Sequence, residues 1–366
     1  MAVTLSRAQV GAPHAAQLDA ERATRCPRWI HRQAVDVAMA LCWIPFAVAA
    51  HALEVDGARL TTFVSGVFLL SFAHQPLTLA LVYGDREQFE LRRAIFAVSP
   101  FVFVLAVVVA LHVSVLALAI VAGLWNAEHT LMQRYGITRI YGRKAGQKEG
   151  RLERALLVSW LVLAVVRVAS DPSTPARLRQ LDMGGTNELA VRTLTRFATP
   201  AGFLVLPALA VAAGVALAWL AAERRRGAAA NPAKWIYVAS TAALFGVILI
   251  DPIAGLMGFV GAHSLEYFVI VHQSLGTRYR DGADPGSAPA RSPLGRAVRA
   301  PTGRLGFLAA YLALILSIVA LLEWRGSADA YLVVFFTLGG LHVFYDGFIW
   351  KLRRPAVARS LGLTGP

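Results

Sequence analysis

The feature that most constrains this chain is a series of apolar runs, each about as long as a lipid bilayer is thick. A helix that crosses the hydrocarbon core needs about 20 mostly apolar residues. The stretches that meet this requirement are 34–53, 60–83, 94–111, 113–132, 153–170, 199–221, 234–250, 253–273, 304–323 and 330–351. We therefore predict an all-α fold, a polytopic integral membrane helical bundle of about 10 transmembrane helices.

Two of these boundaries depend on local signals. The apolar run 94–132 is too long for one ordinary span, so we place a tight turn near His112 and Ser114. The run 234–273 is divided at Asp251, because Pro252 disfavours helical backbone at the residue before it.

The composition excludes several other classes of protein. Hydrophobic residues make up 57% of the chain and charged residues only 16%, which is too little charge for an ordinary soluble enzyme or a disordered protein. The two cysteines, Cys26 and Cys42, are too few for a disulfide-rich scaffold or for a metal site built from thiolates.

The net charge of +14 indicates topology rather than binding of nucleic acid, for which no recognition module is visible. Lys and Arg concentrate in cytoplasmic loops of membrane proteins. With both the N-terminus and the C-terminus in the cytoplasm, few basic residues fall outside, namely Arg59, Arg177, Arg179, Arg192, Arg196 and Arg325. We expect a multi-pass protein of the cell (inner) membrane with the lipid bilayer as its main partner.

The chain divides into one membrane domain and two short tails. Residues 1–33 form a predicted cytoplasmic N-terminal tail, 34–352 a single transmembrane bundle domain, and 353–366 a cytoplasmic C-terminal tail. Within the bundle, 281–303 is rich in Gly, Pro and Arg, which is typical of a flexible basic loop.

Ionisable residues inside the predicted spans are the strongest functional signal, because each is costly unless it is paired, hydrated or bound to a metal. His74, His263 and His342 each lie about nine or ten residues before the inner end of their span, which is about 14 Å from that boundary. Unrelated structural histidines have no reason to share one depth. We therefore expect these three side chains to form one site in the cytoplasmic half of the bundle.

Carboxylates accompany these histidines at helical spacing. His263 and Glu266 are three residues apart and His342 and Asp346 are four apart, so each pair shares a helix face. Imidazole and carboxylate ligands suit iron, manganese or zinc. We predict a metal ion, iron or alternatively zinc, with four histidines as ligands: His74, His129, His263 and His342. Three carboxylates are predicted as catalytic acid–base groups or further ligands: Glu128, Glu266 and Asp346.

The remaining histidines are expected to have other roles. His51 and His112 fall at outer ends of spans, where interfacial residues are common. His272 is nine residues after His263, about half a helical turn out of phase, so it faces elsewhere.

These observations favour a membrane enzyme, a metal-dependent oxidoreductase with non-haem iron that resembles an oxygenase or desaturase in its ligand chemistry. Its substrate would be a hydrophobic small molecule, a lipid or isoprenoid, reached from the cytoplasmic side. Basic cytoplasmic loops would suit an acidic electron donor. A zinc-dependent intramembrane lipid hydrolase and a proton-coupled transporter or carrier remain alternatives, because both also use buried histidines and carboxylates.

Overall fold

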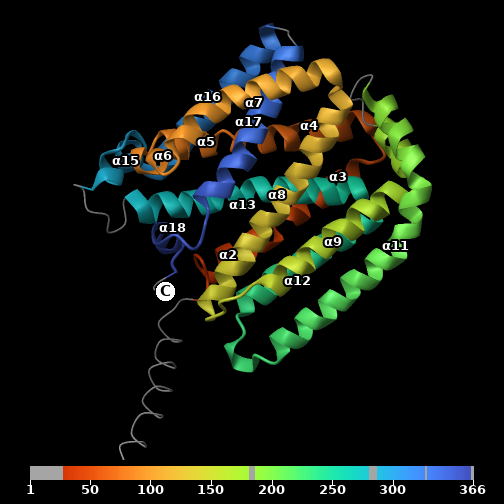
Figure 1. Cartoon of the computed structure of the whole chain (residues 1–366), viewed down its shortest axis with the longest axis horizontal. Coiled ribbons are helices and arrows are strands. Elements are labelled where there is room, and N and C mark those ends of the chain that lie inside the picture. The colour runs from red at the N-terminus through yellow and green to blue at the C-terminus, as the bar shows by residue number, and fades with distance from the viewer. Residues whose placement is uncertain (1–27, 181–185, 280–286, 326–327, 364–366) are drawn as a thin grey trace, which may run out of the picture.

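The computed structural model describes residues 28–180, 186–279, 287–325 and 328–363, and this part of the chain is helical and contains no β-strand (Figure 1). Nine segments of the described chain are long and apolar enough to cross a membrane. The predicted fold class, a helical membrane bundle, is confirmed. The helices are α2 (Gln33–Leu41), α3 (Trp43–Leu53), α4 (Gly57–His74), α5 (Leu77–Tyr83), α6 (Arg86–Glu90), α7 (Arg93–Val113), α8 (Val115–Lys144), α9 (Arg151–Ser170), α10 (Thr174–Gln180), α11 (Thr186–Arg224), α12 (Pro232–Ile250), α13 (Pro252–Tyr279), α14 (Ala288–Arg291), α15 (Pro293–Arg299), α16 (Gly303–Arg325), α17 (Ala328–Ile349) and α18 (Pro355–Ser360).

The predicted span 153–170 corresponds to α9, which is not among the nine apolar segments. Glu153, Arg154 and Arg167 give this helix more charge than the others carry along their apolar stretches. It nevertheless packs along α11, and the two run side by side in Figure 1.

Both predicted breaks within long apolar runs are present. Ser114 separates α7 from α8 in an extended conformation, and its side chain accepts a hydrogen bond from the Ala117 N–H at the start of α8. Helix α12 ends at Ile250 and α13 begins at Pro252, whose missing N–H is tolerated at a helix start.

Helix α13 is the central element and contacts helices from both halves of the chain, including α3, α4, α8, α12 and α18. One close approach depends on a glycine. A Cβ atom at Gly261 would lie 2.6 Å from the ring of Phe46, so only glycine lets α3 pack this tightly on α13.

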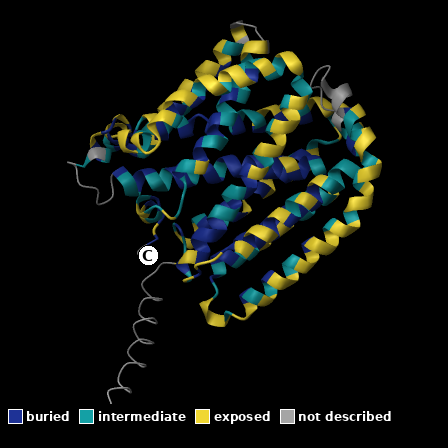
Figure 2. Cartoon of the chain, in the orientation of Figure 1, coloured by how far each residue is buried: buried dark blue, intermediate teal, exposed yellow. Residues whose placement is uncertain are grey.

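Many residues of the peripheral helices are exposed (Figure 2), and large apolar side chains are among them. Only 17% of the most apolar stretch of α7 is buried, and only 11% of that of α11. Such extended apolar surfaces are rare on soluble monomers and fit contact with hydrocarbon. Representative exposed residues are Phe101, Leu105, Phe203 and Leu206.

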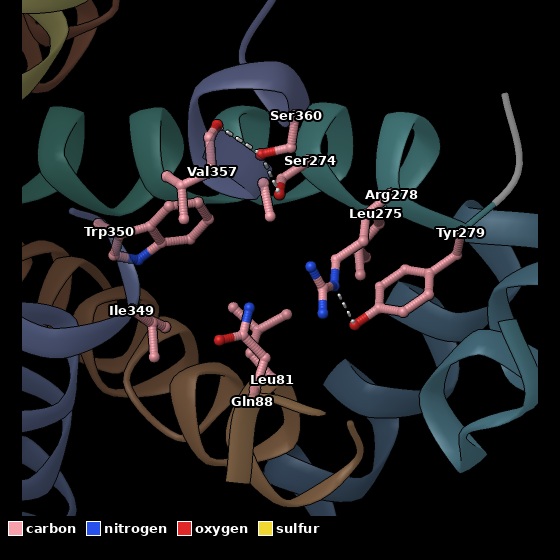
Figure 3. A pocket seen from close by; sticks show the side chains of 11 residues that line it. Leu81, Gln88, Ser274, Leu275, Arg278, Tyr279, Ile349, Trp350, Val357 and Ser360 are labelled. Atoms are coloured by element: carbon pink, nitrogen blue, oxygen red, sulfur yellow. Dashed lines mark hydrogen bonds between the residues drawn. The ribbon is translucent and has the colours of Figure 1, made fainter. Parts of the chain in front are cut away.

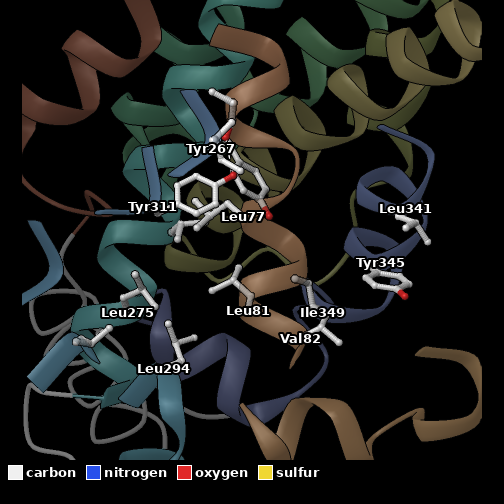
Figure 4. Close-up of a cluster of buried hydrophobic side chains, with 14 of the residues drawn as sticks. Leu77, Leu81, Val82, Tyr267, Leu275, Leu294, Tyr311, Leu341, Tyr345 and Ile349 are labelled. Carbon is white, nitrogen blue, oxygen red and sulfur yellow. Dashed lines mark hydrogen bonds between the residues drawn. The ribbon is translucent and has the colours of Figure 1, made fainter. Parts of the chain in front are cut away.

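Part of the predicted basic loop 281–303 forms the short helices α14 and α15. Leu294 of α15 donates its N–H to the carbonyl of Gly84, and its side chain joins Leu81 and Leu275 in a buried cluster (Figure 4). In the predicted C-terminal tail, α18 packs against α13 and buries Val357.

Candidate metal centre

Four histidines from four different helices meet inside the bundle: His74, His129, His263 and His342. The Nε2 atom of His342 lies 3.2 Å from Nε2 of His74 and 3.0 Å from Nε2 of His129. The ring of His263 is centred 4.6 Å from that of His74 and 5.2 Å from that of His129. All four side chains are buried. The structure thus brings together every histidine that the sequence predicts as a metal ligand.

The local sequence explains why α4 and α17 can place their histidines here. Helix α4 ends at His74, and Pro76, which lacks an N–H, separates it from α5. On α17, Gly339 lies one turn before His342, and a Cβ atom there would come within 3.2 Å of the Gln75 side-chain oxygen. The break and the glycine together allow α17 to approach the α4–α5 junction closely.

Asp346 is the carboxylate that joins the histidines. Its Oδ1 accepts hydrogen bonds from the Thr78 hydroxyl at 2.9 Å and from the Tyr267 hydroxyl at 3.1 Å. Its Oδ2 lies 3.8 Å from Nε2 of His129 and 3.9 Å from Nε2 of His342. One oxygen is therefore held by hydroxyl groups while the other faces the imidazoles.

The hydrogen bonds of Thr78 favour one arrangement of the proton on the His342 ring. When Thr78 donates its single hydroxyl proton to ionised Asp346, its oxygen accepts from Nδ1 of His342, 2.7 Å away. The Nε2 atom of His342 then presents a lone pair toward His74 and His129. An N–H that is held by a neighbour while the other nitrogen remains free is the usual arrangement of a metal-ligating histidine.

The distances and the unpaired atoms suit a bound cation. Two nitrogens that each bind the same metal ion at about 2.1 Å lie about 3.0 Å apart when the N–metal–N angle is about 90°. They lie about 3.4 Å apart when the angle is tetrahedral. In addition, neither ring nitrogen of His263 has a hydrogen-bond partner in the described structure, and neither has Nδ1 of His74. Buried polar atoms normally have partners. The His/Asp groups can therefore hold a metal ion, in the sets His74–His263–His342 and His129–His342–Asp346.

The other two predicted carboxylates lie outside this cluster. Glu266 is fully buried and forms an ion pair with Arg134, with 3.0 Å between the Oε1 and Nη2 atoms. Its Oε2 accepts a hydrogen bond from Gln133. Glu128 is exposed on α8 although His129 beside it is buried, because successive helical residues point about 100° apart. Neither Glu128 nor Glu266 belongs to a group of described residues that could hold a metal ion together with these histidines.

Tyr267, which contacts the cluster, and Arg134, which pairs with Glu266, were not predicted, and each has a signal in the sequence. Tyr267 is four residues after His263 and therefore shares its helix face. Arg134 is five residues after His129, beyond the predicted end of its span, whereas α8 continues to Lys144. Extending the helix would have placed this arginine inside the bundle.

A second His–carboxylate group contains its own counter-ion. His51, Glu54 and Asp251 lie together, and the Arg177 guanidinium donates to Asp251 at 3.2 Å and to Glu54 at 3.4 Å. Burial raises the pKa of Asp251, but hydrogen bonds from the Ala254 N–H and from His51 outweigh this effect and leave the pKa below its ordinary value. An arginine already supplies the positive charge in this group.

Another buried charge cluster ties α9, α11 and α12 together. The Lys234 ammonium, which is fully buried, lies 2.5 Å from Glu153 Oε1 and 2.6 Å from Glu223 Oε1. It also donates to Gln147 at 2.7 Å. All three hydrogens of the ammonium group are therefore used within the protein.

Comparison of the chain with protein-family models, with curated proteins and with solved structures found no match.

Proposed function

We propose that this protein is an integral-membrane oxidoreductase that uses non-haem iron. The main support for the proposal is that four imidazoles and the Asp346 carboxylate converge inside the bundle. Within the described chain, no Lys or Arg forms an ion pair with that carboxylate. A cation from outside would satisfy both the negative charge and the unpaired nitrogens of His263.

The number and type of donors favour iron over zinc. Zinc sites in proteins are mostly four-coordinate, and a catalytic zinc site keeps about three protein ligands. The two ligand sets here share His342 and together offer five nitrogen and oxygen donors, which is more than a four-coordinate zinc site uses and suits six-coordinate iron with an open position. The group His129, His342 and Asp346 also matches the two-histidine, one-carboxylate ligand set of oxygen-activating iron enzymes.

The surroundings favour a hydrophobic substrate, such as a fatty acyl chain, an isoprenoid or a quinone. His129 and Asp346 are 8% and 9% exposed, whereas His74, His263 and His342 are at most 1% exposed. The accessible edge of the cluster therefore lies between α8 and α17, two helices that pack against the largely exposed, apolar α7. A substrate dissolved in the bilayer would enter at this edge.

The topology in this proposal has ten spans, with α9 as the tenth, and both termini in the cytoplasm. The concentration of basic residues in the segments assigned to the cytoplasm supports this orientation. In this arrangement the histidines lie in the cytoplasmic half of the bilayer.

Elemental analysis of detergent-purified protein tests the proposal. We expect about one iron per chain in the wild type, which is the stoichiometry of a mononuclear site. Iron should be lost in His342→Ala and in the near-isosteric Asp346→Asn. The matched control is His112→Ala, which removes an exposed histidine of α7 outside the cluster and should keep its iron. Size-exclusion chromatography and circular dichroism identify a variant that has merely unfolded.

The other outcomes decide between the alternatives. Zinc that is lost in the same variants would indicate a hydrolase instead. Carefully prepared wild type without any metal would refute the proposal and favour a proton-coupled carrier, in which the adjacent imidazoles pass protons.

A further inference from the structure

A line of aromatic contacts leads from the histidine cluster to the end of α17. The ring of His342 is centred 5.1 Å from that of Tyr267, and Tyr267 is centred 6.1 Å from Trp350. Trp350 follows the last residue of α17 and lies at the wall of a small cavity that residues of α5, α6, α13 and α18 also line (Figure 3). These contacts connect the cluster to the surface segment that begins at Lys351.

Positively charged residues follow Trp350 in the sequence, and Arg92 lies close enough to one of them, Arg354, to interact with its charge. We call them the basic patch, which consists of Arg92, Arg93, Lys351, Arg353 and Arg354. Arg92, Arg93 and Arg353 are exposed, and Lys351 and Arg354 are half-buried. Burial and the positive charges of Arg92 and Arg353 lower the pKa of Arg354, as expected where like charges gather.

The basic patch differs from neighbouring cations in having no counter-ion. Arg278, across the cavity from Trp350, is paired with Asp85 at 2.8 Å and with Glu87 at 3.1 Å. Within the described residues, no member of the basic patch forms an ion pair. An uncompensated group of positive charges attracts an acidic partner and raises the rate at which it associates.

We propose that the basic patch is the docking surface for an acidic one-electron carrier protein, and that Trp350 and Tyr267 form the electron path to the metal. This inference rests on the proposed function. In the step, one electron leaves the reduced carrier and converts the bound ferric ion to the ferrous state. The carrier becomes oxidised by one electron, and no covalent bond forms or breaks.

The position of the basic patch favours a protein donor over anionic lipid. Headgroup binding would need only basic residues at the membrane surface. Here Lys351 directly follows Trp350, and Arg353 and Arg354 lie within four residues of it, so the charge is centred on the end of the aromatic line. A redox partner that docked there would be separated from His342 by two aromatic side chains.

Reduction by a plant-type [2Fe–2S] ferredoxin tests the docking surface. Chemically reduced ferredoxin is mixed without oxygen with the ferric protein in phosphatidylcholine nanodiscs, and its oxidation is followed by absorbance. We expect Arg92→Gln/Arg353→Gln/Arg354→Gln to slow the second-order reaction about tenfold or more at low salt and to weaken its salt dependence. The matched control, Arg151→Gln/Arg224→Gln/Arg225→Gln, removes the same charge from exposed arginines of α9 and of the end of α11, and should react like the wild type.

A second variant separates docking from electron transfer. Trp350→Leu should lower the limiting rate at saturating ferredoxin but keep the wild-type salt dependence, and Trp350→Phe should recover part of that rate. Circular dichroism and iron content confirm that each variant is intact.

Four results would overturn the inference. Equal slowing in both triple variants would show that only net charge matters. An effect of the triple variant that occurs only in nanodiscs with phosphatidylglycerol would assign the basic patch to lipid. If ferredoxin reduces the iron-loaded wild type and the iron-loaded triple variant of the basic patch at the same rate, only the docking surface is refuted. Wild type that contains no iron would refute the proposed function and this inference together.

Discussion

Replacing Thr78 with valine tests whether the hydroxyl network around Asp346 exists to hold a metal ion. Valine has nearly the same shape as threonine but cannot form a hydrogen bond. In the wild type, the fully buried Thr78 hydroxyl donates to Asp346 over 2.9 Å and lies 2.7 Å from Nδ1 of His342. The substitution therefore removes one hydrogen bond from each of two groups that the proposed metal would bind, His342 and Asp346.

The expected size of the effect follows from these two hydrogen bonds. Loss of a group that orients metal ligands typically weakens metal binding about 10–100-fold, which corresponds to about 1.4–2.8 kcal/mol. The metal-free protein should also lose stability, because the buried N–H of His342 is left without a partner, and this costs about 1–3 kcal/mol.

Chelator competition measures this prediction. The dissociation constant for ferrous ion is determined without oxygen for the wild type, Thr78→Val and the control Thr78→Ser, which keeps the hydroxyl and loses only a methyl group. Thr78→Ser should bind metal like the wild type. Wild-type affinity in Thr78→Val, or an equal loss in both variants, would contradict the assignment of Thr78 as a positioning residue.

Three further predictions concern stability. Arg134→Ala leaves the buried Glu266 carboxylate unpaired and should destabilise the protein by about 3–5 kcal/mol; Arg134→Ala/Glu266→Gln should recover part of this in thermal unfolding. Removal of metal by a chelator should lower the unfolding midpoint, by an amount equivalent to about 2.7 kcal/mol if free iron was at 100 times its dissociation constant, and added ferrous ion should restore it. Hydrogen bonds from the Ser173 hydroxyl and N–H lower the pKa of Asp171. The ionised Asp171 therefore contributes its full stabilisation above the ordinary pKa of about 3.9, and this contribution is lost as the pH falls below that value. The thermal unfolding midpoint should thus fall less between about pH 5 and pH 3 in Asp171→Asn than in the wild type.

The meeting of three of the four histidines was predictable from their depth in the predicted spans. A polar side chain at bilayer depth must find a partner inside the bundle. Equal distances of His74, His263 and His342 from their span ends therefore implied contact before any packing was known. The i, i+4 spacing of His342 and Asp346 likewise placed the carboxylate on the same face.

The partner of Glu266 was not predictable from spacing alone. The predicted span ended at residue 132, because charged residues follow, but α8 remains helical to Lys144. Arg134 therefore lies inside the bundle, where it pairs with Glu266 and also donates to Thr241. Hydropathy marks where apolar sequence ends, whereas a helix ends only where its backbone hydrogen bonds lose support from packing or capping.

The ion pairs of the other buried carboxylates give a second argument for a metal ion at Asp346, in addition to the geometry. Glu266 pairs with Arg134, Glu153 and Glu223 both pair with Lys234, and Asp85 pairs with Arg278. At each of these places the chain itself supplies the positive partner that a buried carboxylate requires. Asp346 is also buried, but it accepts hydrogen bonds from the Thr78 and Tyr267 hydroxyl groups, and within the described chain its ion-pair contacts are with His129 and His342. Protonated histidines crowded at 3.0–3.2 Å would repel each other, so a single divalent ion would neutralise Asp346 with less repulsion than several imidazolium groups would create.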